Sequence, residues 1–355
     1  MERFAIVLSL LVAGVVAVGS FISFDHGAGF PHFGSSRAAT TGKPTPTGAE
    51  ALQPGRARSF ATASLEVRDA AARLTIAPED RADIVVEVSG GSGLPALKAG
   101  LENGTLVIDG ELDNRLRSCN RNNDDWTIQV EDLGPIRLES APQIVVRAPR
   151  ALAVRVFGAV EGRIGQTQSL QLEQEGCSNV AVEDVAGRLQ VETAGSGDVR
   201  AGRAGSAEVT SRGSGDVVLG EVGGALKAMV QGSGAIHSAA VAGPADLDLR
   251  GSGELSTGSV AGPLTANLAG SGGLDVAHAQ GPVVTLIVAG SGDLRVADGR
   301  TERLEVRIAG SGNVEFGGVT RDLDANIAGS GSVRVRQATG NVSKSVAGSG
   351  RVVIE

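Results

Sequence analysis

The sequence is poor in aromatic residues, histidine and cysteine, and these shortages exclude several kinds of protein. Its 355 residues include no tyrosine, one tryptophan, eight phenylalanines, four histidines and two cysteines. A metal centre built from clustered histidines or cysteines has little material here, and we expect no cofactor. The formal net charge of −8 lacks the basic footprint of a nucleic-acid-binding protein, so no nucleic-acid partner is expected.

Glycine is in excess. The chain contains 52 glycines, roughly twice the usual share. They follow no three-residue period and only 12 prolines accompany them, which excludes collagen. With 41% hydrophobic and 20% charged residues, the chain is too apolar to be disordered throughout.

The first 24 residues predict an export signal or a membrane anchor. A charged start at residues 1–3 is followed by an uncharged, mostly apolar run over 4–24. A signal peptide would be cleaved near Gly19, whereas about 20 apolar residues also suffice to span a bilayer uncleaved. Either alternative places the rest of the chain outside the cytoplasm, in the periplasm, at the cell surface or anchored to a membrane. Residues 25–60 lack a hydrophobic period and predict a flexible linker.

A repeat of about 19 residues dominates the second half of the chain. The triplet Gly-Ser-Gly recurs at spacings of 18 to 20 residues. Its first glycines are Gly195, Gly213, Gly232, Gly251, Gly270, Gly290, Gly310, Gly329 and Gly348. A degenerate copy, Gly176-Cys177-Ser178, precedes them. Such a near-constant period predicts a solenoid.

Between the triplets, apolar and other residues alternate. A branched aliphatic residue stands four places after each first glycine, as at Val199 and Leu255, and a second alternating run, such as Leu304-x-Val306-x-Ile308, leads into the next triplet. Period two indicates strands with one buried face. We therefore predict an all-β fold over residues 158–355, a parallel β-helix whose coils each hold at least two short strands.

The triplets are predicted to form the corners of the coils. Glycine tolerates positive φ and lets neighbouring coils approach closely. The serines are expected to stack as a hydroxyl ladder that bonds neighbouring backbone groups. The first three corners consist of Gly195, Ser196, Gly197, Gly213, Ser214, Gly215, Gly232, Ser233 and Gly234. A second corner is marked by Gly-Pro pairs such as Gly243-Pro244.

Residues 61–157 are strand-like but irregular, either early coils, which we favour, or a cap. Three features of this region support a family resemblance: the alternating segments over 65–88, the turn Asn103-Gly104 before Leu106-Val107-Ile108, and Ile144-Val145-Val146 leading into the repeats. On these features, residues 61–355 resemble the putative auto-transporter adhesin head GIN domains. The resemblance implies a secreted or envelope-anchored, right-handed parallel β-helix, and it transfers no catalytic motif. This chain has more triplets than the resemblance leads us to expect.

Acidic residues follow several triplets, at Asp198, Asp216, Glu254 and Asp293. Asp198 and Asp216 would lie on adjacent coils, which suits a cation or sugar site. The alternative is a solvated position beside a turn, where acids are common. His237 and His278 fall at different repeat positions and are not expected to share a metal ion.

Cys119 and Cys177 are the only cysteines, and an even number in an exported protein favours a disulfide between them. Trp126 follows a polar loop and is interpreted as a buried strand residue, with a binding contact as the alternative. Lys344 occupies a strand phase that should face inward. The C-terminal coil is expected either to self-associate with another subunit or to be protected by Arg351 and Glu355.

These observations favour a non-enzymatic, exported cell-envelope protein, an adhesin or scaffold that acts through the β-helix surface. Its partner would be an envelope or surface component, either glycan or protein. Two alternatives are a carbohydrate-active β-helix enzyme and a membrane-tethered module that senses or regulates envelope stress.

Overall fold

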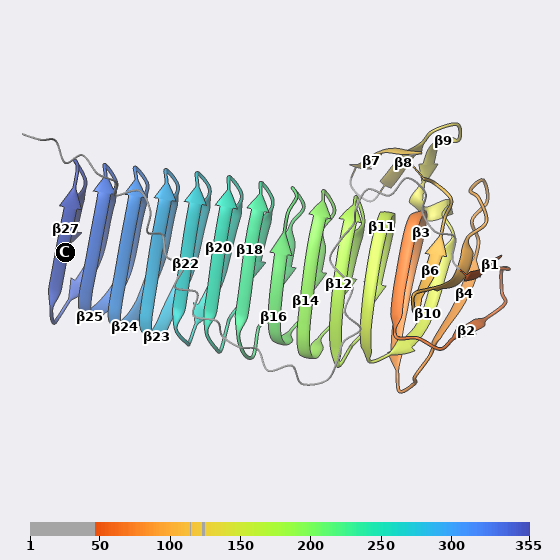
Figure 1. Cartoon of the computed structure of the whole chain (residues 1–355), viewed down its shortest axis with the longest axis horizontal. Coiled ribbons are helices and arrows are strands. Elements are labelled where there is room, and N and C mark those ends of the chain that lie inside the picture. Colours follow the sequence, from red (N-terminus) through yellow and green to blue (C-terminus); the bar gives the residue numbers. More distant parts are fainter. Residues whose placement is uncertain (1–46, 114, 123–124) are drawn as a thin grey trace, which may run out of the picture.

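A computed structural model describes residues 47–355 except 114, 123 and 124, and its repeats form a long rod of stacked coils (Figure 1). The fold is a parallel β-solenoid of about 11 turns with a spacing near 19 residues, as predicted. One short 3-10 turn, η1 (Leu138–Ser140), interrupts the strands of the described region. The predicted signal or anchor lies outside the described residues. Within them, no helix has the length and apolarity required to cross a membrane.

Each regular coil has three walls. On the first wall, every strand pairs in parallel with its copy one repeat later, as Leu247 does with Ala266. The second wall follows the triplet corner, and there Ile236 pairs with Leu255. A third, very short wall consists of single bridges such as Val222 to Val241, before the Gly-Pro corner returns the chain to the first wall. The backbone edge of each coil is therefore satisfied by its neighbours.

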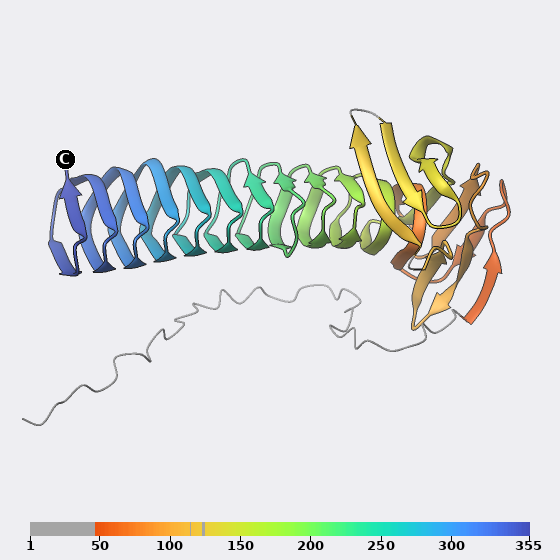
Figure 2. The same cartoon turned by 90° about the horizontal axis from the view of Figure 1, so that it is seen from above.

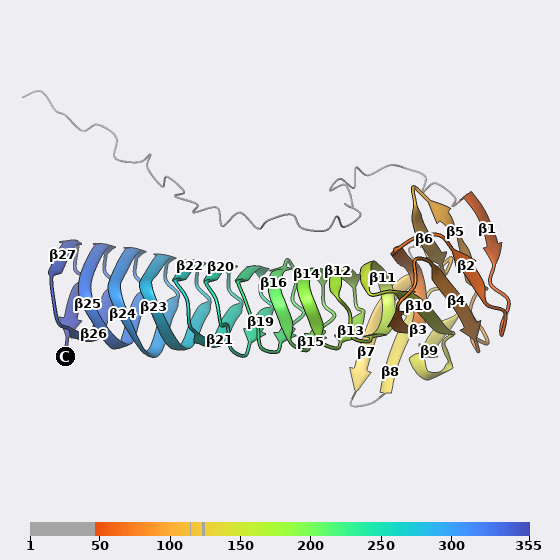
Figure 3. The ribbon, with the colours of Figure 1, turned by 90° about the horizontal axis from the view of Figure 1, so that it is seen from below.

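The strands of the two longer walls alternate along the chain (Figure 3). The first wall contains β12 (Ser169–Gly176), β14 (Val185–Gly195), β16 (Ala204–Ser211), β18 (Leu226–Gly232), β20 (Ala245–Gly251), β22 (Leu264–Gly270) and β27 (Val342–Ala347). The second wall contains β13 (Asn179–Val182), β15 (Val199–Ala201), β17 (Val217–Leu219), β19 (Ala235–Ser238), β21 (Glu254–Val260), β26 (Ser332–Ala338) and β28 (Arg351–Ile354). Three long strands, β23 (Gly273–Gly290), β24 (Asp293–Gly310) and β25 (Asn313–Gly329), run from the second wall through to the first.

The interior consists of columns of aliphatic side chains, one residue from each coil. The residues four places after the first glycine form one such column along the second wall, and all but the last are fully buried. They are Val180, Val199, Val217, Ile236, Leu255, Leu274, Leu294, Val314, Val333 and, half-buried, Val352. Because strand side chains alternate between faces, the period-two pattern in the sequence fixes which residues point inward.

The coil stack begins before the predicted boundary at residue 158. β3 (Ser64–Glu79) and β11 (Ala151–Ile164) each bend through one corner and pair in parallel with each other. β6 (Thr105–Asp109) and β10 (Gln143–Pro149) pair in parallel with the outer edge of β3. Beyond them, β4 (Ile84–Ser89) and β5 (Lys98–Glu102) pair antiparallel with β10 and β6. The N-terminal region thus contains both coils and an antiparallel covering.

The segment predicted to be a linker, residues 25–60, contains two strands and so differs from the prediction in its last part. β1 (Thr47–Ala51) pairs antiparallel with β5, and β2 (Arg58–Phe60) pairs antiparallel with β4. Leu52 and Phe60 anchor this segment in the core. Local composition could not show this, because both pairing strands come later in the chain.

A separate three-stranded antiparallel sheet projects from the side of the rod (Figure 2). It consists of β7 (Leu116–Asn122), β8 (Asp125–Val130) and β9 (Gly134–Arg137). Together with η1 we call these residues, 116–140, the flap.

Candidate interaction surface

The triplet corners are held by close backbone contact between coils. Gly195 has a φ of 147°, in the region that favours glycine. A Cβ placed on Gly195 would overlap the carbonyl oxygen of Gly176, and one on Gly197 would overlap the carbonyl oxygen of Ser178. The corners starting at Gly213 and Gly232 show the same overlaps with the coil before them. Both glycines of a triplet are therefore required for neighbouring coils to stack.

The serines between these glycines form an exposed ridge along the rod, and their hydroxyls do not bond as expected. Ser196, Ser214 and Ser233 are solvent-exposed. Backbone groups join the corners instead, as where the Ser214 N–H donates to the Gly195 carbonyl over 2.8 Å. The one contact between ridge hydroxyls joins Ser252 and Ser271, at 3.4 Å in the described structure. The small serine side chain points to water because the backbone fills the space between coils.

The flap covers this corner ridge over the first coils. The residues that precede Ser196 in the ridge are Ala71, Ala159 and Cys177, so serine is absent where the flap packs. Ala71 and Ala159 are buried in a second hydrophobic cluster with Trp126 and Ile128 of β8. Trp126 is thus a buried strand residue, the first of its two predicted roles.

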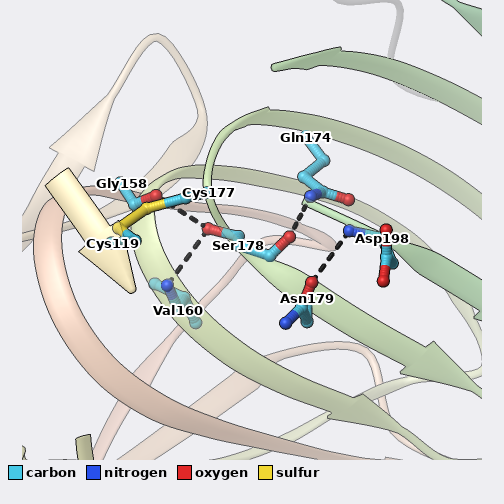
Figure 4. Close-up of a disulfide and its surroundings, with 8 residues drawn as sticks. All are labelled: Cys119, Gly158, Val160, Gln174, Cys177, Ser178, Asn179 and Asp198. Atoms are coloured by element: carbon cyan, nitrogen blue, oxygen red, sulfur yellow. Dashed lines mark hydrogen bonds between the residues drawn. A yellow bond between two sulfur atoms is a disulfide. The ribbon is translucent and has the colours of Figure 1, made fainter. Parts of the chain in front are cut away.

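A disulfide joins the flap to the ridge (Figure 4). Cys119 on β7 is bonded to Cys177 in the degenerate triplet, with 6.4 Å between their Cα atoms. The bond spans 58 residues of sequence. It fixes the flap to the corner directly before the first exposed serine, Ser196.

The degenerate triplet uses a different hydroxyl to join coils. Ser178, in place of the second glycine, donates to the Gly158 carbonyl and accepts from the Val160 N–H, both at 3.1 Å (Figure 4). Gln174 donates from its side-chain amide to the Ser178 carbonyl. A fully buried serine therefore makes the backbone bonds that the sequence led us to expect of the ridge serines.

The acidic residues after the triplets are engaged in the second wall. The Asp198 carboxylate accepts from the Asp216 N–H at 3.1 Å, and the Asp216 carboxylate accepts from the Ala235 N–H at 3.0 Å. Asn179 begins this ladder by accepting from the Asp198 N–H at 2.8 Å. Each side chain of the ladder bonds the next coil. This structural use supports the turn interpretation over a cation or sugar site.

The same kind of ladder appears once more among the described contacts, with two steps. Asp293 accepts from the Asn313 N–H at 3.2 Å, and Asn313 accepts from the Ser332 N–H at 3.2 Å. Glu254, with its longer side chain, shows no such bond among the described contacts; its own N–H donates to the Gly234 carbonyl. In the sequence, the signal for this ladder is the recurrence of aspartate or asparagine three places after the first glycine of a triplet.

At two other corners, Asp184 and Asp322 bond the next coil in the same way, and hydrogen bonding lowers the pKa of each carboxyl. Asp184 accepts from the side chain and the N–H of Arg203, which lowers its pKa. Asp322 accepts from the Asn341 N–H and from Arg321, which also lowers its pKa. In both cases hydrogen bonding to the charged carboxylate is the cause.

The histidines make separate contacts. His237 lies 2.6 Å from the Ser256 hydroxyl, and His278 lies 3.5 Å from Asp298. Within the described residues, no three histidine, cysteine or acidic side chains group in a way that would hold a metal ion.

The first wall of the C-terminal coils presents an outward surface of mostly short side chains, among which Ile287, Glu305 and Arg307 are longer. Its outward positions on β22, β23, β24, β25 and β27 form three columns. They contain Thr265, Thr285, Glu305, Asp324 and Ser343; Asn267, Ile287, Arg307, Asn326 and Ser345; and Ala269, Ala289, Ala309, Ala328 and Ala347. The alanine column is exposed throughout and borders the serine ridge. We call this surface the alanine face.

The family model described as "Putative auto-transporter adhesin, head GIN domain" matches residues 69–242 and again 239–355. The chain belongs to this family. The first match spans the early coils and the flap, and the second spans coils to which no flap is attached. Two matches in tandem account for the number of triplets, which exceeded what the resemblance led us to expect.

Three solved structures align with most of this chain at low sequence identity. A "putative lipid binding protein" from Parabacteroides distasonis ATCC 8503 is 20% identical, covering 85% of this chain and 98% of its own, with a TM-score of 0.30. A "putative adhesin" from the same organism is 15% identical, covering 80% and 96%, also with a TM-score of 0.30. A "putative adhesin" from Bacteroides fragilis NCTC 9343 is 14% identical, covering 84% and 96%, with a TM-score of 0.28. No match was found among curated proteins.

Proposed function

We propose that this GIN-domain protein is an exported, non-enzymatic adhesin or scaffold of the cell envelope that binds an extended surface component through the side of its rod. Family membership supports an adhesin-like role. The N-terminal segment would deliver the chain outside the cytoplasm, where the disulfide between Cys119 and Cys177 persists.

The observation that carries the proposal is the alanine face. Hydroxyl, amide, carboxylate and methyl groups recur along this wall at the spacing of the coils, about 4.8 Å, and Arg307 is the one cation in its three columns. Such a surface suits an extended partner that is contacted many times weakly rather than a compact ligand held in one pocket. Its polar groups, such as those of Thr285 and Asn326, provide donors and acceptors for a glycan or for a polypeptide backbone.

The experiment is a pull-down of isolated cell-envelope fragments with the full chain and two variants. Ala289→Arg places a long charged side chain in the middle of the alanine face and should reduce capture at least tenfold. Ala277→Arg changes another exposed alanine of β23, outside the alanine face, and should leave capture unchanged. Equal capture by both variants would exclude the alanine face. Treating the fragments with protease or with periodate beforehand separates a protein partner from a glycan.

The alternative function, that of a carbohydrate-active enzyme, requires a separate experiment. Asp198 and Asp216 already accept hydrogen bonds from the backbone of the next coil, which supports a structural role over a catalytic one. We expect no new reducing ends or unsaturated sugars when the chain is incubated with envelope polysaccharides. Product formation that is abolished by Asp198→Asn or Asp216→Asn would replace our proposal with the enzymatic one.

A further inference from the structure

One interior column changes character at the last described coil. On the first wall its members are aliphatic in each coil from β3 to β25, and Lys344 follows Ala325 in register on β27. The aliphatic members are Leu65, Val154, Leu172, Val191, Val209, Ala228, Leu247, Ala266, Leu286, Val306 and Ala325. Lys344 is the one charged residue in this column.

Its neighbours on the same coil keep the interior pattern. Val342 and Val346 continue the columns of Leu323 and Ile327, yet they are 43% and 42% exposed because no coil lies beyond them in the described structure. On the second wall, Val352 and Ile354 pack against the core while remaining half-buried. The coil therefore offers an apolar row and an open strand edge, the two features on which another strand can add.

The groups predicted to protect this coil do not cover Lys344. Glu355 turns back to Arg334 of the coil beneath it, at 3.7 Å. The Arg351 N–H donates to the Gly331 carbonyl of that same coil. Lys344 makes no ion pair within the part of the chain that the structure describes. The residue as a whole is exposed to water.

We infer that Lys344 keeps the C-terminal coil from stacking on a second copy of this chain. A strand added to β27 in the register of the repeats would enclose the lysine side chain in the interior. An ammonium that is buried without a partner is strongly unfavourable, and inward-pointing charges are a known protection of strand edges. The lysine thus opposes the association that the valines beside it favour.

The test compares the full chain with three variants by sedimentation velocity and by hydrogen exchange of the β27 and β28 amides. Lys344→Val restores the column and should associate at a concentration at least tenfold below that of the unchanged chain. Its β27 amides should become protected as concentration rises. Lys344→Arg keeps the charge and should behave like the unchanged chain.

Ser345→Val is the matched control, because it adds the same side chain to the outward side of the same strand. It should not protect the β27 amides. The inference is overturned if Lys344→Val shows no concentration-dependent protection, if Ser345→Val or Lys344→Arg associates equally, or if the unchanged chain already pairs through β27.

Discussion

The N-terminal region, residues 47–164, and the C-terminal coils, residues 239–355, share one interior design but differ in what surrounds it. In the N-terminal region, antiparallel strands, the flap, a disulfide and a buried ion-pair network surround the coils. The C-terminal coils are held by backbone ladders and aliphatic columns, and their corner ridge is exposed. The comparison shows that a coil needs only its neighbours to stack, whereas a covered coil also depends on contacts between distant parts of the sequence.

The largest expected effect concerns the N-terminal network. Arg68 is buried and binds Asp109 at 2.8 Å and Glu102 at 3.1 Å, with Glu66 at 3.6 Å. Arg68→Leu removes the cation that Asp109 and Glu102 share, so we expect a loss of about 3–5 kcal/mol in unfolding free energy. Hydrogen exchange should locate the loss in β3, β5 and β6. Equal loss in β24 and β25 would show that the two regions unfold as one unit.

The second prediction tests the shared corner design. Gly197→Ala and Gly312→Ala each place a Cβ on a carbonyl oxygen of the preceding coil, that of Ser178 or Gly292. Both should lower the unfolding free energy by about 1–3 kcal/mol or more, measured by chemical denaturation. The adjacent Ser196→Ala and Ser311→Ala changes should stay within about 0.5 kcal/mol, because these hydroxyls are exposed. A large loss for a serine variant would show that the ridge is structural.

The third prediction separates the flap from the coils. Replacing both Cys119 and Cys177 by serine removes a cross-link over 58 residues and should lower the stability of the flap by about 2–4 kcal/mol. The β8 amides should exchange faster, as they should in the unchanged chain after reduction. Exchange in β23 to β25 is expected to stay the same. Faster exchange there would contradict the independence of the C-terminal coils.

The smallest expected effects depend on pH and have opposite signs in two coils. Burial raises the pKa of Asp246 from its ordinary 3.8, so its ionised form is disfavoured in the fold. Its stabilising contribution is present at low pH and is lost as pH rises through the folded pKa, so Asp246→Asn should stabilise at pH 7. Hydrogen bonds from Arg203 lower the pKa of Asp184, whose contribution is present at neutral pH and lost as pH falls. Asp184→Asn should therefore destabilise at pH 7. Denaturation at pH 7 and pH 3 should show both differences shrinking in acid.

The coils could be predicted from the sequence because each one repeats the same pattern of alternating apolar residues and paired glycines. Alternation placed Val199 and Leu255 in the interior, and the paired glycines marked the corners where a Cβ has no space. These features depend on residues a few positions apart, or one period apart, so periodicity alone shows them.

The parts that the sequence did not predict depend on pairing across longer distances. β1 and β2 find partners in β5 and β4, and the flap packs on corners formed by β3 and β11. Asn179, Asp198 and Asp216 share one repeat position, which the sequence shows. That each side chain accepts a hydrogen bond from the backbone N–H of the next coil is seen only in the structure. The direction of the ridge serine hydroxyls likewise depends on the space between coils, and this space cannot be inferred from composition.

Because the coils pair in parallel and in register, the length of the rod can change by whole coils. Since Gly251 pairs with Gly270 and each coil contacts mainly the coils on either side, deleting one full repeat, residues 252–270, would rejoin equivalent positions. The protein would become shorter by about 4.8 Å while every remaining column keeps its phase. Loss or duplication of such a segment in the gene can therefore change the length of the rod. No new kind of contact is required, because each remaining coil meets an equivalent neighbour.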